Sequence, residues 1–167
     1  MKTILCYGDS NTWGYIPGTA SRYPRQVRWT GVLQNLLGEK FHVIEEGLNG
    51  RTTVMDDPTR IAKNGLPYLR PCLDSHAPID LVVLMLGTND TKHRFGLSAF
   101  DISEGVAMLV NIIQQSAAGL NNRAPAILLV SPVVLDPAPE KSALFEGAAQ
   151  KSRELAGHIE NVAKANR

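Results

Sequence analysis

The sequence predicts an α/β protein, a three-layer sandwich in which helices cover both faces of a parallel sheet. Four short apolar runs alternate with helical patterns, and this alternation is typical of parallel strands joined by right-handed crossovers. The runs are brief, and glycine or polar residues end them, as expected of strands buried on both faces. No repeat, low-complexity tract or linker divides the sequence, so we expect a single domain over 1–167.

The composition is ordinary for a soluble globular protein. Hydrophobic residues make up 44% of the chain and charged residues 20%. With 17 basic and 16 acidic residues, the formal net charge is +1, which gives no electrostatic footprint for nucleic acid or an anionic membrane. Met1 and Lys2 lead directly into the first apolar run, and no run approaches membrane-spanning length. We therefore expect a cytoplasmic protein with neither nucleic-acid nor membrane partners.

The four apolar runs are the expected strands, at 3–7, 41–45, 80–86 and 126–130. Glycine and polar residues follow the first three of them closely. The carboxyl ends of parallel strands meet at one edge of a sheet, where open α/β proteins bind their ligands. The residues that follow these three strands should therefore lie close together.

The segments between the strands carry helical periodicity. Trp29 begins an amphipathic pattern that Gly38 closes, and a short helix is expected over 67–73. Ser98, with Asp101 three residues later, predicts a capping box for a helix that we expect Gly119 to close. The last helix should carry an apolar stripe made of Leu144, Ala148, Leu155, Ile159 and Val162.

Three other stretches are expected to be irregular. The segment from Asn11 to Arg25 is polar and longer than a minimal strand-to-helix connection, which is common in functional loops. The stretch 56–65 shows no periodicity, and Pro132, Pro137 and Pro139 indicate an extended loop after the fourth strand.

Ser10 is the candidate nucleophile, because it lies one step past the first strand in the sequence Gly8-Asp9-Ser10. A serine at that position sits at the ligand-binding edge of the sheet. The alternative is that Ser10 or Asp9 only caps the following helix, as serine and aspartate often do.

Two further clusters could complete a site around this serine. Gly50, after the second strand, offers a backbone N–H, and Asn89, after the third, offers a side-chain amide. Together with a serine hydroxyl, these groups would supply a nucleophile and donors for a developing oxyanion, as acyl transfer requires. By itself, Asn89 could also be a turn residue that bonds to its own backbone.

These clusters and their surroundings resemble the SGNH (GDSL) hydrolases, and within them the bacterial arylesterase and acyltransferase branch. The resemblance covers the whole chain. It is carried by Gly8-Asp9-Ser10 with Thr12-Trp13-Gly14, by 27–33, by 43–48 with Arg51-Thr52-Thr53, by 85–92, and by Val130-Ser131-Pro132.

The resemblance implies a flavodoxin-like fold and a serine esterase or acyltransferase that needs neither metal nor cofactor. By position, Ser10 is the nucleophile, and its own N–H, the Gly50 N–H and the Asn89 amide form the oxyanion hole. Further residues are implied in support (Asp9 and Asp90) and in the substrate pocket (Asn11 and Trp13). The partners implied are a small ester, a water or alcohol acceptor, and further copies of the chain in a homo-oligomer. Asn11 departs from the leucine that is common after the serine.

The family also places Asp-x-x-His after a fifth strand near its C-terminus, whereas this sequence ends at Arg167. We therefore expect a C-terminally shortened domain without the fifth strand or the general base that a serine nucleophile needs. Asp90 and His93 have the Asp-x-x-His spacing, but the family uses that aspartate structurally. The expected positions of His42, His76 and His158 are unsuitable, at the opposite edge of the sheet or on helices.

Two alternatives to the esterase remain open. Without its base the chain could be a non-catalytic module that keeps the pocket or serves assembly. A flavin or nucleotide binder is a weaker possibility, because the sequence lacks a phosphate-binding Gly-x-x-x-x-Gly-Lys-Ser/Thr motif. Cys6 and Cys72 suggest neither a disulfide framework nor a metal site, and a catalytic pair of Cys72 with His76 is disfavoured because such partners usually come from distant parts of a chain.

Overall fold

The computed structural model describes residues 1–136 and 142–166, and these ranges contain one four-stranded parallel sheet with the order β2-β1-β3-β4. Its strands are β1 (Lys2–Gly8), β2 (Phe41–Gly47), β3 (Leu81–Met85) and β4 (Ala126–Leu129). All four coincide with the apolar runs of the sequence, and the predicted α/β fold with a parallel sheet is confirmed. Pro137 and Pro139 of the expected loop lie outside the described residues.

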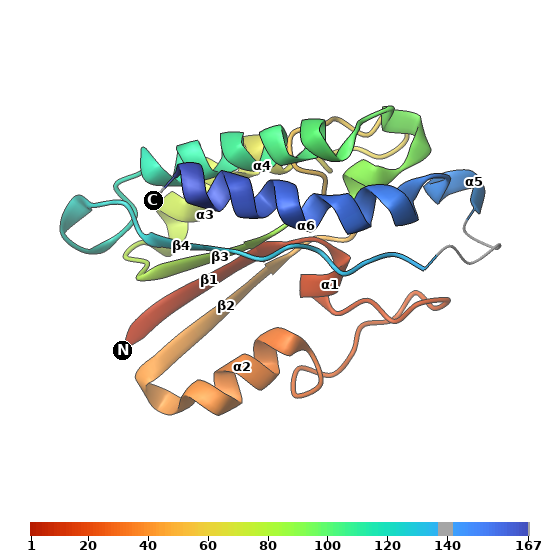
Figure 1. Ribbon diagram of the computed structural model, residues 1–167. Helices are drawn as coiled ribbons and strands as arrows, with labels where there is room; N and C mark the ends of the chain where they lie inside the picture. The colour runs from red at the N-terminus through yellow and green to blue at the C-terminus, as the bar shows by residue number, and fades with distance from the viewer. Residues whose placement is uncertain (137–141, 167) are drawn as a thin grey trace.

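Helices lie on both sides of this sheet (Figure 1). One layer contains α3 (Gly65–His76), α4 (Ala99–Gln114) and α6 (Ala148–Ala165), and α2 (Trp29–Leu37) lies on the opposite side. Two short helices, α1 (Ser10–Trp13) and α5 (Ser142–Phe145), lie near one end of the sheet. The single-turn 3₁₀ helices are η1 (Gly38–Lys40), η2 (Asn89–Thr91), η3 (His93–Phe95) and η4 (Leu120–Asn122).

The register of the sheet brings three strand ends together. Gly8, the last residue of β1, pairs with Gly47 of β2 on one side and with Met85 of β3 on the other. The turns that follow these strands therefore start at the same level and on the same edge. His42 pairs with Thr3, at the other end of β2, which confirms that this histidine lies away from the edge that carries Ser10.

Alternate side chains of the strands contribute to two hydrophobic cores, one on each face of the sheet. Leu5 and Tyr7 of β1 point into the larger core, together with residues of α3 and α4, whereas Ile4 and Cys6 point to the α2 side. A third cluster joins α4 to α6 through Ile102 and Leu155. Because β1 is buried on both faces, its apolar run is continuous rather than alternating.

Several helix ends differ from the sequence-based expectation. The capping box of Ser98 and Asp101 and the end of α2 at Gly38 are confirmed. However, α4 ends at Gln114, before Gly119, whose N–H bonds to the Arg123 carbonyl instead. The expected last helix is two helices, because Gly147 adopts a left-handed φ of 74° between α5 and α6.

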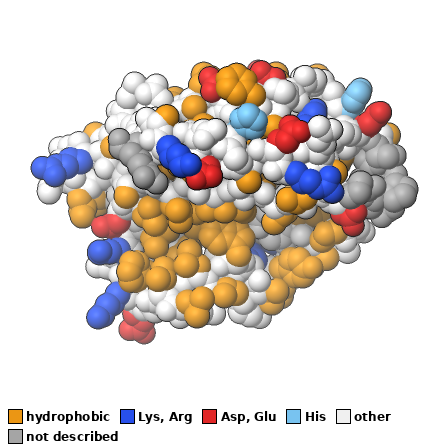
Figure 2. All heavy atoms as spheres, viewed as in Figure 1, with side chains coloured by type: hydrophobic (Ala, Val, Ile, Leu, Met, Phe, Trp, Pro, Cys, Tyr) orange, Lys and Arg blue, Asp and Glu red, His pale blue; other side chains and the backbone are white. Residues whose placement is uncertain are grey.

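The α2 side of the sheet leaves apolar surface exposed beyond β3. Leu128 of β4 is 50% exposed and Leu36 of α2 is 80% exposed. Figure 2 shows hydrophobic side chains gathered in a band on this side of the molecule. Exposed apolar side chains on this side line a groove of about 810 Å³, which we call the apolar groove. Its lining residues are Asn11, Val27, Trp29, Val32, Leu33, Leu36, Val83, Met85, Leu128, Val130 and Val133. Within the described residues, no helix is long and apolar enough to cross a membrane.

Candidate active site

Ser10 begins the short helix α1, directly after β1. Asp9 is the N-cap of this helix, and its Oδ1 accepts a hydrogen bond of 2.8 Å from the Asn11 N–H. Of the two residues that could cap this helix, Asp9 is therefore the one that does, and the Ser10 side chain does not take part in capping. In the described part of the chain the Ser10 hydroxyl makes no hydrogen bond.

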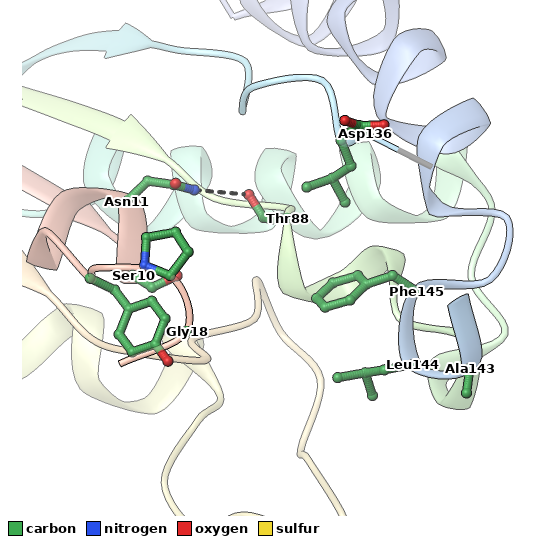
Figure 3. Close-up of a pocket in the computed structure, with 11 residues that line it drawn as sticks. Ser10, Asn11, Gly18, Thr88, Asp136, Ala143, Leu144 and Phe145 are labelled. Atoms are coloured by element: carbon green, nitrogen blue, oxygen red, sulfur yellow. Dashed lines mark hydrogen bonds between the residues drawn. The ribbon is translucent and has the colours of Figure 1, made fainter. Parts of the chain in front are cut away.

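Ser10 opens into a cavity of about 530 Å³ at the edge of the sheet. In Figure 3, Ser10 and Asn11 lie on one side, and Leu144 and Phe145 reach in from α5 on the other. The remaining lining residues are Tyr15, Pro17, Gly18, Thr88, Leu135, Asp136 and Ala143. The serine therefore faces a partly apolar space large enough for a small organic molecule.

The two residues expected in the pocket wall behave differently. Asn11 lines the cavity, and its Nδ2 donates hydrogen bonds to Asp9 Oδ1 at 3.1 Å and to Thr88 Oγ1 at 3.4 Å. Trp13 is not among the lining residues of this cavity, whereas Tyr15, Pro17 and Gly18 of the loop that follows it are. The centroid of the Trp13 ring lies 5.0 Å from the Arg22 guanidinium carbon.

The turn that carries Gly50 is attached to the end of β1. The Leu48 N–H donates to the Gly8 carbonyl at 3.1 Å, and Arg51 Nη1 donates to the same carbonyl at 2.9 Å. Gly50 has a φ of 83°, a conformation that glycine adopts without strain. The Arg51 guanidinium is buried and lies 4.1 Å from the Tyr7 ring, so a cation–π contact also holds the turn.

Asn89 is attached to the same turn from the other side. It is buried in η2, and its Nδ2 donates a hydrogen bond of 3.0 Å to the carbonyl of Arg51, next to Gly50. An Asn amide has two N–H donors, so one remains for another acceptor. The Asn89 side chain therefore bonds to a neighbouring loop. The alternative that the sequence had left open was a hydrogen bond to the backbone of its own turn.

Asp90 fixes the relation between these two turns. Its Oδ1 accepts hydrogen bonds from the Thr53 N–H at 2.9 Å and from Thr53 Oγ1 at 2.6 Å. Burial raises the pKa of Asp90 to about 6, although the hydrogen bonds from Thr53 oppose this rise. Burial likewise raises the pKa of Asp9 above its usual value, against the hydrogen bonds from Asn11. Both carboxyl groups are buried.

The four histidines all lie in the described part of the chain, and no hydrogen bond joins any of them to Ser10 there. His76 Nε2 lies 2.8 Å from Glu46 Oε1, and the ring of His158 packs edge-on against Phe100. His93, which has the Asp-x-x-His spacing, is exposed, and its Nδ1 is 3.9 Å from Glu146. Cys72 also lies near His76, but burial raises the pKa of its thiol to about 12, which makes it a poor nucleophile.

Sequence reasoning missed several residues of this site. Arg51 and Thr53 entered only as parts of a motif, although both are buried and hold the Gly50 and Asn89 turns. The signal available in the sequence was the position of Arg51-Thr52-Thr53 directly after Gly50. Leu144 and Phe145 reach the cavity from the far end of the chain, and no local pattern in the sequence indicates that.

Comparison with known proteins agrees with this arrangement of strands and turns. A search of curated proteins gives no match. Among solved structures, Est24, a carbohydrate acetylesterase from Sinorhizobium meliloti, is 42% identical with a TM-score of 0.92, over 98% of this chain and 80% of that one. The native aryl esterase of M. smegmatis is 46% identical with a TM-score of 0.91, over the same shares of the two chains. A family model matches residues 6–167, so the chain belongs to the GDSL-like lipase/acylhydrolase family.

Proposed function

We propose that this chain carries the acylation site of a serine-dependent esterase that acts on small esters. Ser10 attacks the ester carbonyl and forms an acyl-enzyme, and the acyl group passes to water or to an alcohol. The Ser10 N–H, the Gly50 N–H and the free amide hydrogen of Asn89 stabilise the oxyanion, with no metal or cofactor. Such preorganised donors usually supply the largest single contribution to acyl transfer.

One observation carries this proposal most strongly. The Ser10 hydroxyl does not cap a helix, because Asp9 is the N-cap of α1, and it faces a cavity beside the ends of β2 and β3. The turns with Gly50 and Asn89 are tied to each other through Arg51, whose carbonyl accepts from Asn89. The two solved relatives, a carbohydrate acetylesterase and an aryl esterase, further support small esters as substrates.

Among the described residues, the Ser10 hydroxyl has no general base as a hydrogen-bond partner. A serine hydroxyl is a weak nucleophile near neutral pH without an adjacent base. In well-studied serine proteases, removing triad members leaves about 10³ to 10⁴-fold catalysis over water. We therefore expect slow turnover from these 167 residues alone.

A second candidate function follows from the same feature together with the apolar groove beside β4. A chain with a pocket, no base beside Ser10 among its described residues and an exposed hydrophobic surface would suit a non-catalytic binding or assembly module. Such a surface also supports the expected homo-oligomer. Under this alternative, Ser10 would contribute to binding but form no covalent intermediate.

Hydrolysis of 4-nitrophenyl acetate separates the two functions. After subtraction of the hydrolysis that imidazole causes without protein, the esterase proposal predicts release of nitrophenol that depends on Ser10 and rises when imidazole is added as an external base. The variant Ser10→Ala should lose both effects, and Ser21→Ala, an exposed serine outside the cavity lining, should keep them.

Mass spectrometry provides a second readout, because an acyl-enzyme adds an acetyl group to the peptide that contains Ser10. Equal rates for the unmodified chain and Ser10→Ala, with and without imidazole, together with no acetylated peptide, would favour the non-catalytic module.

A further inference from the structure

Three side chains with different donor atoms meet between β2 and α3, and we call them the mixed-donor cluster: Glu46, Cys72 and His76. They offer a carboxylate oxygen, a sulfur and a ring nitrogen, and these three atoms all lie within 4.8 Å of one another. The distance between Glu46 Oε1 and His76 Nε2 is 2.8 Å. Oxygen, sulfur and nitrogen donors therefore converge at one place in the fold.

Helix periodicity and strand position together produce this cluster. Cys72 and His76 are four residues apart near the end of α3, so their side chains project from the same face of the helix. Glu46 is the last residue but one of β2 and reaches them from the sheet. The sequence shows Cys72 and His76 only as a pair, because the third donor joins them through folding.

The mixed-donor cluster is accessible from solvent on one side. Cys72 is fully buried, whereas the side chains of Glu46 and His76 are 19% and 28% exposed. Glu46 also lines a hollow of about 390 Å³, whose other lining residues are Gly47, Leu48, Arg51, Asp56, Ala62, Asn64, Pro67 and Tyr68. A small ion can therefore reach the carboxylate and the imidazole, with the thiol at the inner end of the cluster.

The charges around the cluster leave the Glu46 carboxylate available to a cation. In the described part of the chain its ion pair is with His76, and no lysine or arginine pairs with it. Arg51 is a positive residue on the wall of the hollow, but its guanidinium donates to the backbone carbonyl of Glu46 and lies over the Tyr7 ring. A carboxylate and a thiolate together neutralise a divalent ion, so the loaded cluster would add no net charge beside Arg51.

We propose that the mixed-donor cluster binds a zinc ion through the Glu46 carboxylate, the Cys72 thiolate and the neutral His76 imidazole. Zinc holds such ligands at about 2.0–2.3 Å in tetrahedral geometry, which places the donor atoms about 3.3–3.7 Å apart. Donors that already lie within 4.8 Å of one another need only small side-chain movements to reach it. Calcium and magnesium do not fit this donor set, because they prefer oxygen ligands throughout.

Binding also requires proton release, since zinc is held by the deprotonated forms of these ligands. The Cys72 thiol gives its proton to solvent, and His76 Nε2 gives up any proton that it shares with Glu46. With three protein ligands, water completes the four-coordinate site. The ion would fasten the end of α3 to the end of β2, the strand that leads into the Gly50 turn.

This site goes beyond the proposed esterase function, because none of its three residues lines the Ser10 cavity. The acyl transfer proposed for Ser10 uses no metal, and the zinc ion would contribute to stability. Zinc at 100 times its Kd should raise the ratio of folded to unfolded chain about 100-fold, which is measurable as a higher melting temperature.

The test uses the full chain, first freed of metal with a chelator. Calorimetric titration with zinc chloride should show one ion bound per chain, and magnesium chloride should bind far more weakly. Titration with Co²⁺ reports the sulfur ligand directly, because a cobalt–thiolate bond gives a charge-transfer band in the near ultraviolet. We expect this band in the unmodified chain and its loss in Cys72→Ala.

Variants locate the ion. Glu46→Gln, His76→Gln and Cys72→Ala should each weaken zinc binding by at least about tenfold. Glu46 and His76 are partly exposed, so their variants remain informative if replacing the buried cysteine impairs folding. His42→Gln is the matched control, because His42 is an exposed histidine at the opposite end of β2, and it should keep the affinity. No zinc binding by the unmodified chain would show an ion pair beside a core thiol only, and affinity that survives all three variants would show adventitious binding elsewhere; either result would overturn the proposal.

Labelling of Ser10 by a fluorophosphonate separates this site from the proposed active site. We expect labelling to be the same with and without zinc, since the mixed-donor cluster lies outside the cavity lining. Labelling that zinc blocks equally in the unmodified chain and in Glu46→Gln would place the ion at the Ser10 cavity and overturn the assignment. Zinc binding by the mixed-donor cluster without any labelling of Ser10 would support the metal site and count against the esterase proposal.

Discussion

Replacing Asp90 by asparagine tests how the protein stabilises the turn that carries Asn89. Burial raises the pKa of this carboxyl group from 3.8 to about 6, against the hydrogen bonds from Thr53. A raised pKa in the folded state means that the native protein binds this proton more tightly than the unfolded chain does. The contribution to stability is therefore complete below pH 4 and is lost as the pH rises through 6.

The magnitude follows from the size of the shift. A change of about two pKa units at about 1.4 kcal/mol per unit corresponds to about 3 kcal/mol. Asparagine is neutral at every pH, and its carbonyl can still accept from the Thr53 N–H. Asp90→Asn should therefore gain about 3 kcal/mol in free energy of unfolding relative to the unmodified chain between pH 4 and pH 7.

Urea unfolding of both proteins at several pH values, followed by tryptophan fluorescence, measures this difference directly. The difference between the two proteins isolates residue 90 from carboxyl groups with lowered pKa values, such as Asp57 and Asp101. Parallel stability profiles for the two proteins would refute the reasoning, because they would show that the Asp90 proton is held equally in the folded and unfolded states.

Three other predictions concern packing around the site. Gly47→Ala would place a Cβ 2.2 Å from the Trp13 backbone nitrogen, and we expect a loss of about 1–3 kcal/mol in urea unfolding together with weaker Ser10 labelling; unchanged labelling would contradict the contact. Leu155→Ala, fully buried between α4 and α6, should cost about 2–5 kcal/mol in the same assay, and a loss below 1 kcal/mol would mean that the helices repack. Because burial raises the pKa of the Cys6 and Cys72 thiols to about 12, neither should react with a disulfide reagent until urea unfolds the protein, whereas rapid reaction in native buffer would show that these thiols become accessible.

The strands were predictable from the sequence because each is a short, largely apolar run, and the central strands β1 and β3 are buried on both faces. Their parallel arrangement also fixed which turns share an edge, and the pairing of Gly8 with Gly47 and Met85 follows that expectation. The capping box of α4 was readable from Ser98 and Asp101 because it is a local pattern of hydrogen bonds.

Short or interrupted helices were not predictable in the same way. The helix α1 spans only Ser10–Trp13, too few residues for an apolar period, so the sequence there looked like a loop. The break at Gly147 was hidden because the apolar spacing from Leu144 to Ala148 continues across it. The wall formed by Phe145 depends on contacts between distant parts of the chain, which periodicity does not report.

The proposed nucleophile and oxyanion donors follow the ends of β1, β2 and β3, three adjacent strands with β1 in the centre. The edge strand β4 and the apolar groove lie beyond them, so whatever covers that surface need not alter the register that brings the three turns together. Oxyanion stabilisation and proton transfer are then separable in this fold. The register of the central strands positions the oxyanion donors, whereas a group outside those turns would accept the proton. Rescue by a small external base would therefore succeed if the three turns are already organised in the 167-residue chain, and it would have little effect if they form only when the apolar groove is covered.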